Sequence, residues 1–305
     1  MSKFNKRVYG VVGIKSKMAN WNADFSGNPR TTSDGTIFGS DKAFKYPIKK
    51  MWEANNKDVL YVKSYKNKDD DIQARTLSER FEQLFGENVK NLKDKREIVK
   101  YLFSAIDVLN FGATFAEENN NISITGAVQV GQGFNKYEDS SAEIIDILSP
   151  FTNKSTDKNT SIGKKIVSNE AHYFYPFSVN PENYNIYTNE IEGLEGYTKE
   201  AYDAFKEGCL VAATAYNTNS KAGCENELAI FVECKEFSKL YLANLDEYIN
   251  FKKGEEKDII DLSELMQILN KDEVKKEIEK VEIYYNPYTT ELEGDLAIAD
   301  VKDLF

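Results

Sequence analysis

The sequence predicts an α+β fold. Short apolar runs rich in β-branched residues predict strands, and segments with apolar residues at helical spacing predict helices. The two kinds of segment follow one another in the order strand, helix, strand pair, helix, strand. With 305 residues and 41% hydrophobic content, the chain can bury a large core, as one domain with insertions or as two smaller domains.

The first strand and helix are predicted near the N-terminus. RVYGVVGI, at Arg7–Ile14, is a short apolar run typical of a buried strand. A loop rich in Asn, Gly, Ser and Thr follows over Met18–Gly39. Ser40 is suited to cap a helix over Asp41–Ala54, whose apolar residues recur on one face. Pro47 lies inside this helix, where it removes one backbone hydrogen bond and favours a kink.

The next stretch predicts an insertion and a hairpin. After a charged loop at Lys66–Asp71, the apolar residues from Ile72 to Phe85 indicate a small helical insertion. A further helix is expected over Arg96–Asp107. Two β-rich runs then follow at Leu109–Ala116 and Ile122–Val130, separated by EENNN, and they predict a β-hairpin.

Residues 131–172 are polar and interrupted, and we interpret them as a protruding arm. Asn153–Lys165, NKSTDKNTSIGKK, has the composition of a flexible loop and only one large apolar residue, so it can add little to a core. An arm of this composition is expected to become ordered on a partner.

The last elements complete the predicted core. A helix is expected over Thr198–Tyr216 and a strand over Glu227–Cys234. Residues 236–305 form an acidic segment with two short helices and a final strand near Val281–Tyr285. The order matches the βαββαβ order of a ferredoxin-like or RRM-type sheet with insertions. The signature with which ordinary RRM domains stack bases is absent, so RNA binding would need another route.

Charge is distributed unevenly along the chain. The formal net charge of -11 argues against a polyanionic partner. However, residues 1–66 contain 13 Lys or Arg against 5 Asp or Glu, and the rest contains 26 against 45. The basic N-terminal part could therefore face nucleic acid, or it could simply be a solvated surface.

Cysteines and hydropathy indicate a cytoplasmic protein without a membrane partner. Cys209, Cys224 and Cys234 show no CxxC spacing, which indicates neither a disulfide framework nor a zinc site. No apolar stretch approaches the roughly 20 residues of a membrane helix, and the N-terminus has no apolar signal-peptide region.

The helix after Ser40 is the first candidate site. Lys42, Lys45 and Lys49 stand at i, i+3 and i+7, so their ammonium groups would line one face and could follow phosphates. The amides at the helix start beside Ser40 offer a second phosphate site. The alternative is an ordinary amphipathic helix with a solvated lysine face.

Two further segments could contact RNA. The loop Asn20–Gly35 combines aromatic with polar and basic residues, as expected where bases stack; its candidates are Asn20, Trp21, Asn22, Phe25 and Arg30. The alternative is a loop fixed to its own core by Trp21 and Phe25. Gly126–Asp139 contributes Gly131, Phe134 and Lys136, where glycine permits close backbone approach; a glycine-rich bend is the alternative.

Catalytic chemistry finds little support in the sequence. The single histidine, His172 in AHYFYPF, has no protease-like arrangement around it and is interpreted as a structural residue. Asp24 and Asp34 could hold a metal ion, but turn formation explains Asp34 before Gly35 equally well. We therefore expect no catalytic residue, no metal site and no cofactor.

Several segments closely resemble one known family. RVYGVVGIKSKMANWNADFSG, FGSDKAFKYPIKKMWE, NISITGAVQVGQGFNKYED, AHYFYPFSVNP and NTNSKAGCENELAIF resemble the type I-B branch of the seventh CRISPR-associated family, the Cascade backbone subunit. These segments span about residues 7–235. The acidic segment after Lys235 carries no such motif.

The resemblance implies a modified RRM shaped like a hand. It places an RRM-like palm with insertions at 1–235, helical fingers near 56–96, a thumb at 131–172 and the acidic segment 236–305 packed on the palm. The palm strands would be Arg7–Ile14, Leu109–Ala116, Ile122–Val130 and Glu227–Cys234. The family's guide-binding helix follows a Ser-rich turn and carries basic residues four apart, which match Lys45 and Lys49.

The resemblance also implies a function without chemistry. The family holds the CRISPR guide RNA (crRNA) along a filament of copies, so that exposed bases pair with target DNA. Further copies and other Cascade subunits would be the protein partners, and the thumb would cover RNA held by a neighbour. Two alternatives stay open: a metal-dependent ribonuclease of the type III kind using Asp24 or Asp34, and a scaffold whose basic end binds an acidic protein.

Overall fold

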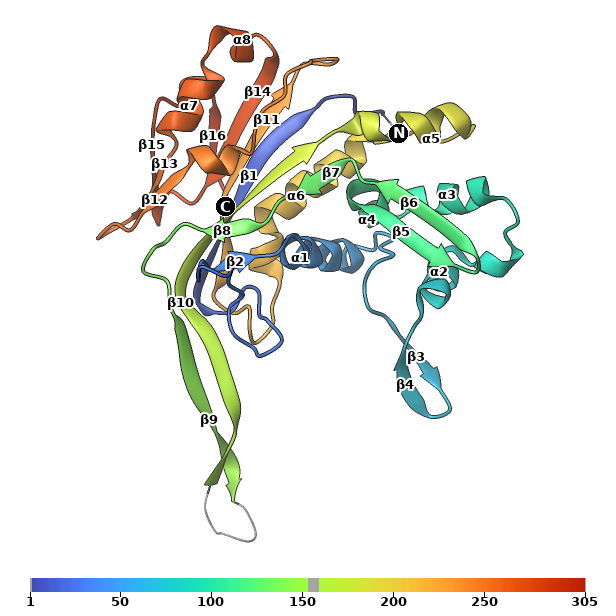
Figure 1. Ribbon diagram of the computed structural model, residues 1–305, viewed down its shortest axis with the longest axis horizontal. Coiled ribbons are helices and arrows are strands. Elements are labelled where there is room, and N and C mark those ends of the chain that lie inside the picture. The colour runs from blue at the N-terminus through green and yellow to red at the C-terminus, as the bar shows by residue number, and fades with distance from the viewer. Residues whose placement is uncertain (1, 153–158, 305) are drawn as a thin grey trace.

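A large, mostly antiparallel sheet organises the fold of this computed structural model (Figure 1). The structure describes the backbone of residues 2–152 and 159–304, and it describes their side chains except at residues 149–162. Its strand order is β16-β14-β11-β1-β10-β8-β2, and β7 and β9 also pair with β10. The strands are β1 (Val8–Ala19), β2 (Phe38–Gly39), β7 (Val128–Val130), β8 (Gly133–Asn135), β9 (Ala142–Thr152), β10 (Asn159–Val179), β11 (Cys224–Cys234), β14 (Ile278–Tyr285) and β16 (Asp300–Asp303).

Both faces of the sheet are covered, which explains the continuous apolar run in β1. Val8 and Val12 belong to a core cluster on one face, whereas Tyr9 and Val11 belong to a second cluster on the other. Because successive strand residues point to opposite faces, a strand buried on both sides is apolar at nearly every position.

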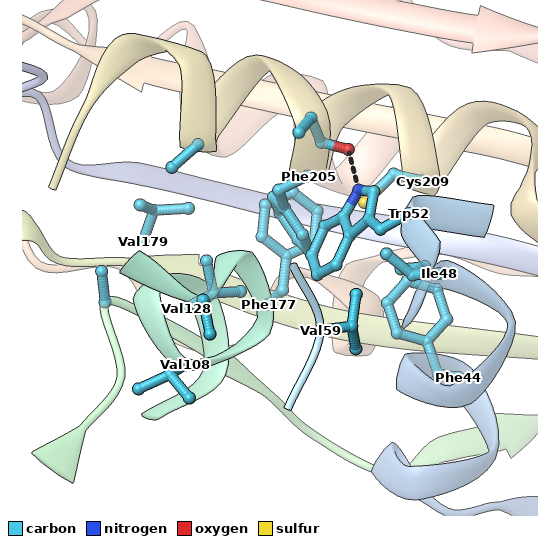
Figure 2. Packing of buried hydrophobic residues seen from close by; sticks show 14 of the residues in the cluster. Phe44, Ile48, Trp52, Val59, Val108, Val128, Phe177, Val179, Phe205 and Cys209 are labelled. Carbon is cyan, nitrogen blue, oxygen red and sulfur yellow. Dashed lines mark hydrogen bonds between the residues drawn. The ribbon is translucent and has the colours of Figure 1, made fainter. Parts of the chain in front are cut away.

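Two helices cover the first face. α1 (Asp41–Ala54) and α6 (Lys199–Ala215) pack against each other, and Figure 2 shows Trp52 between them. The Trp52 Nε1 donates to the Ala204 carbonyl at 3.1 Å. Gly208 permits the close approach, because a Cβ there would lie 2.7 Å from Cγ2 of Ile48. The predicted boundaries of α1 are confirmed, and Ser40 caps it by accepting from the Ala43 N–H.

The C-terminal residues cover the second face. Leu245, Ile260 and Met266 are among those that bury the strand residues Tyr9 and Val11. The elements are η3 (Leu245–Tyr248), β12 (Asn250–Lys252), β13 (Asp258–Asp261), α7 (Ser263–Leu269), α8 (Asp272–Lys275) and β15 (Thr290–Glu293). This layer buries the second face of the sheet along β1, β10 and β11, so bases could not stack there.

An insertion between α1 and β7 forms a separate lobe beside the sheet (Figure 1). Thr76 and Glu79 form a capping box at the start of α2, the first helix of this lobe, as the sequence pattern favours. Its elements are β3 (Tyr65–Lys68), β4 (Asp71–Ala74), α2 (Leu77–Phe85), η1 (Val89–Asn91), α3 (Lys95–Ser104), α4 (Ile106–Phe111), β5 (Gly112–Glu117) and β6 (Asn120–Thr125). Two short helices, η2 (Pro181–Tyr184) and α5 (Asn185–Glu190), follow β10.

The structure corrects the predicted central strands. Leu109–Ala116 and most of Ile122–Val130 do not join the large sheet, because β5 and β6 pair only with each other among the described strands. Only β7, at the end of the second run, reaches it. The central position belongs to β10, although no strand was predicted for its AHYFYPF sequence. Its aromatic side chains pack on both faces, and the run lacks the β-branched residues that identify β1 as a strand.

The arm is a two-stranded ribbon made of β9 and the first half of β10. β10 pairs with β1 from Val179 to Ser168, and beyond that point it pairs only with β9 among the described strands, so the ribbon projects from the sheet (Figure 1). Residues 153–158, within the predicted flexible loop, lie outside the described residues. The described part is less polar than expected, because β9 exposes Ile144, Ile145, Ile147 and Leu148.

Candidate nucleic-acid interface

Several predicted site residues converge on the start of α1. The Asn22 Oδ1 accepts from the Ser40 N–H at 2.8 Å, and the Gln132 Oε1 accepts from the Asp41 N–H at 3.3 Å. The long N-terminal loop and the β7–β8 connection therefore meet at this helix end. Because these side chains and Ser40 already satisfy first-turn amides, the predicted phosphate site on the amides is largely closed. Ser40 acts here as a cap.

The three predicted lysines have different surroundings. Lys42 is exposed and makes no ion pair among the described residues. Lys45 pairs with Asp41 at 2.9 Å, and Lys49 lies 3.7 Å from Asp107. Burial lowers the pKa of Lys49, although Asp107 opposes this effect. The three lysines are therefore not equivalent, and Lys42 is the member most available to a phosphate.

Asp107 is an important residue that the sequence analysis missed. Its buried carboxylate accepts from the Leu60 and Tyr61 N–H groups, both at 2.8 Å, and faces Lys49. The Lys45 and Lys49 ammonium groups lie 5.3 and 6.0 Å from the centre of the Phe111 ring. These contacts fix α1 against the inserted lobe. An aspartate in an otherwise apolar run was the signal available in the sequence.

Trp21 and Asn20 prove to be structural. Trp21 is 1% exposed, and its Nε1 donates to the Tyr175 hydroxyl at 2.6 Å, so no base can stack on its ring. Asn20 is also buried, and its Nδ2 donates to the Gly27 carbonyl at 3.0 Å and the Ile166 carbonyl at 3.1 Å. The predicted ligand contacts of these two residues are therefore wrong, because both join the N-terminal loop to β10.

The outer part of the same loop is a small hairpin with exposed residues. The Arg30 N–H donates to the Asn22 carbonyl, and the Asp24 N–H donates to the Asn28 carbonyl. Arg30 is partly exposed, and its Nε is buried without a hydrogen-bond partner among the described residues. Phe25, at the tip, is fully exposed (107%). Of the loop's two aromatic residues, one is core and the other faces solvent.

Asp24 and Asp34 both organise their own turns. The Asp24 Oδ1 accepts from the N–H groups of Ser26 and Asn28 at 2.8 and 2.9 Å. The Asp34 Oδ1 accepts from the Thr32 hydroxyl and from the Thr36 N–H. The hydrogen bond from Thr32 lowers the pKa of Asp34, with the Thr36 amide adding to it. Turn formation is thus sufficient to explain both carboxylates.

The β7–β8 residues divide between two neighbours. The Gly131 N–H donates to the Pro176 carbonyl at 2.8 Å, and a Cβ there would lie 2.8 Å from Cγ of Pro176, so the close approach is to the chain itself. Phe134 is half-exposed, with its ring centre 6.0 Å from that of Phe38. Lys136 instead donates to the Asp246 carbonyl at 2.7 Å and joins β8 to the C-terminal layer.

His172 forms the centre of a buried ionic cluster. Its Nδ1 lies 2.8 Å from Glu227, its Nε2 lies 3.4 Å from Glu170, and Phe251 stacks on its ring. Burial alone would lower the pKa of His172, but the two carboxylates outweigh this and raise it to about 9. His172 is therefore protonated at neutral pH and stabilises the fold through its two carboxylate neighbours, which agrees with the structural role predicted for it.

The same cluster could geometrically hold a cation. Oxygens of Glu170 and Asp258 and a nitrogen of His172 lie within 4.8 Å of one another. However, the Lys253 ammonium lies 2.8 Å from Glu170 and 2.9 Å from Asp258, and Lys15 lies 3.0 Å from Asp258. Lysine charge already neutralises these carboxylates, so the cluster is an ion-pair network that links the sheet to the C-terminal layer.

Comparisons with known proteins identify the family of this chain. No helix among the described residues is long and apolar enough to cross a membrane. A search of curated protein sequences found no match. One chain of a solved CRISPR RNA-guided surveillance complex, pre-nicking, superposes with a TM-score of 0.60 at 14% identity, covering 97% of this chain and 96% of that one.

A chain of a second CRISPR RNA-guided surveillance complex gives a TM-score of 0.50 at 14% identity, covering 96% and 94%. The model of the CRISPR-associated protein Cas7 family matches residues 6–284, which is most of the sequence. The chain therefore belongs to the Cas7 family.

Proposed function

We propose that this chain binds CRISPR guide RNA as the repeating backbone subunit of a type I Cascade surveillance complex, of subtype I-B. The match to the Cas7 family over residues 6–284 carries this proposal. Chains of two RNA-guided surveillance complexes share its fold over almost their whole length, which supports it. Other Cascade subunits, further copies of the chain and target DNA paired with the guide would be its partners.

The sheet supports a ferredoxin-like palm within the proposed subunit. The elements follow the βαββαβ pattern in the chain order β1, α1, β7 with β8, β10, α6 and β11, where β7 and β8 both pair with β10 and together take the place of one strand. Their spatial order is β11-β1-β10-β8. On this proposal the palm with its insertions spans residues 1–235, with fingers at 56–96 and a thumb at 131–172. Residues 236–305 would form the acidic layer packed on the palm.

The RNA would be held mainly through its sugar-phosphate backbone. The C-terminal layer covers the sheet face that ordinary RRM domains use, so the RNA should lie at the start of α1. There Lys42, Arg30, Asn22 and Phe134 offer charge, hydrogen bonds and an aromatic surface. Contacts to phosphate do not distinguish sequences, as a protein that accepts many guides requires. Ser40, Gly131, Lys45 and Lys49 would position this surface, the last two through their acidic partners.

We propose no catalytic activity for the chain. The carboxylates of the ribonuclease alternative, Asp24 and Asp34, are both engaged in turns, and His172 is enclosed by carboxylates inside the protein. Cleavage of target would then belong to another component.

Binding of single-stranded RNA at several salt concentrations tests the proposed surface. Lys42→Ala should weaken binding without changing sequence preference and should lower the log-log salt slope by about 0.7, the value for one phosphate contact on a single strand. Lys271→Ala removes an exposed lysine from the acidic layer and serves as the matched control. An unchanged slope for Lys42→Ala would contradict the proposed RNA path.

A further inference from the structure

The tip of the N-terminal loop displays an aromatic ring that its own fold does not use. Phe25 has a relative exposure of 107%, whereas Trp21, four residues earlier in the same loop, is 1% exposed. Moving a phenylalanine ring out of water lowers the free energy of the system, so a completely exposed ring does not stabilise the isolated chain. Some other molecule could use that surface.

The turn that carries Phe25 is built to hold it in one place. The Asp24 carboxylate accepts from the Ser26 and Asn28 N–H groups, and the Asp24 carbonyl accepts from Gly27. Gly27 has φ +86°, which glycine adopts without strain. Because the turn is already ordered, a ligand that stacks on the ring has little loop entropy to overcome.

The same turn is fixed to the root of the arm. The buried Asn20 amide donates both to the Gly27 carbonyl in the turn and to the Ile166 carbonyl in β10. Ile166 lies just beyond Ser168, where β10 stops pairing with β1. The loop that carries Phe25 is therefore anchored to the root of the arm through Asn20 and to the start of α1 through Asn22.

The surroundings favour a nucleic acid over a protein as the occupant. Arg30 closes the hairpin that carries Phe25, and its Nε is buried without a partner among the described residues. Lys17, at the entry to the loop, is exposed. The residues next to Phe25, Asp24 and Ser26, are polar, so the ring is a single aromatic surface rather than the centre of an apolar patch. Exposed aromatic rings and cationic side chains in one loop region are typical of single-stranded nucleic-acid binding.

We infer that Phe25 is a stacking platform for one base of the single-stranded RNA that this chain binds. This inference rests on the proposed function, and it adds an aromatic contact with a base to the proposed contacts with the RNA phosphates. Stacking is tolerant of sequence, because every base has a flat face, and it is therefore compatible with guides of any sequence. Trp21 and Asn20 act in this arrangement by holding the turn, and Asp24 acts by shaping it.

Fluorescence anisotropy with a labelled single-stranded RNA and the full-length chain tests this assignment. Phe25→Ala should weaken binding by about 5- to 150-fold, the range that corresponds to losing one stacked base. Phe25→Trp should bind like the parent, whereas Phe25→Leu should be weakened, because leucine keeps the apolar bulk but lacks a flat ring. The salt slope should not change in any of these variants, since no charge is removed.

Two controls separate this inference from the proposed function. Phe237→Ala removes another exposed ring, 75% exposed in the C-terminal layer, and should not change the affinity. If Lys42→Ala weakens binding while Phe25→Ala does not, the stacking assignment is wrong and the RNA-binding proposal stands. If both leave the affinity unchanged, the proposed RNA path itself is wrong. If Phe25→Ala binds RNA normally but no longer assembles with further copies, the ring contacts protein and the inference is overturned.

Discussion

The N-terminal part of the chain and the C-terminal segment differ in how they use charge. The C-terminal segment, residues 236–305, contains 9 Lys or Arg against 18 Asp or Glu. Where it meets the sheet its charges are paired, as with Lys253 and Glu170 or Asp258 and Lys15. Residues 1–66, with 13 basic residues against 5 acidic ones, leave Lys42 and Lys17 exposed. The C-terminal segment uses charge to close a face of the sheet, whereas the N-terminal part leaves cationic side chains exposed to solvent.

Replacing Trp21 should have the largest effect on stability. Trp21→Ala removes a buried ring and its hydrogen bond to Tyr175, so we expect a loss of about 3–5 kcal/mol in the free energy of unfolding. Phe25→Ala, in the same loop, should change stability by less than about 0.5 kcal/mol because the ring is exposed. Denaturant titration measures both. Equal losses of unfolding free energy in the two variants would contradict the assignment of Trp21 to the core and Phe25 to the surface.

The ionic cluster beneath the C-terminal layer should make stability depend on alkaline pH. The pKa of His172, raised to about 9, lies above the ordinary value near 6.5, so its contribution is complete below about pH 6.5 and is lost as the pH rises through 9. We expect the free energy of unfolding to fall by roughly 3 kcal/mol over this range.

His172→Gln should be less stable than the parent at neutral pH and should lose this alkaline decline. The neighbouring His172, and after it Lys253, lower the pKa of Glu170, so its stabilisation should be lost in the opposite range, as the pH falls through acid values. Parallel pH profiles for the parent and His172→Gln would contradict the imidazolium assignment.

The sequence predicted the elements that local patterns define and missed those defined by long-range packing. α1 was predicted with its boundaries and cap, because Ser40 and the apolar spacing are local signals. β10 was missed as the strand next to β1, because its AHYFYPF run contains His172 and Pro176 and lacks the β-branched residues that identified β1. At the site, spacing along α1 showed three lysines, but Asp107, which pairs with one of them, comes from a helix far along the chain.

Lys45→Ala combined with Lys49→Ala should have an intermediate effect. Removing Lys49 leaves the buried Asp107 carboxylate with backbone donors but without its ammonium partner, so we expect a stability loss of about 1–3 kcal/mol. The salt slope for RNA binding should fall by less than the roughly 1.4 expected for two free phosphate contacts. A full reduction of the slope with unchanged stability would show that both lysines contact RNA directly.

The arm should show the smallest effect on the isolated chain. Ile144→Ser with Leu148→Ser changes two exposed side chains of β9, so the melting temperature should barely move. We expect assembly of several copies on a guide RNA to be impaired, because exposed aliphatic residues on a projecting ribbon are suited to burial against a partner. Analytical ultracentrifugation with RNA measures this. Normal assembly of the double variant would show that the apolar face of β9 does not contribute to the interface between copies.

The most direct test of the central proposal is to sequence the RNA that accompanies the protein when it is purified from cells carrying a CRISPR array. A guide-binding subunit should carry RNA of uniform length, with repeat-derived sequence flanking variable spacers, and Lys42→Ala should recover less of it. Recovery of no RNA, or of RNA without repeat-derived sequence, would contradict the assignment of this chain as the subunit that holds the guide.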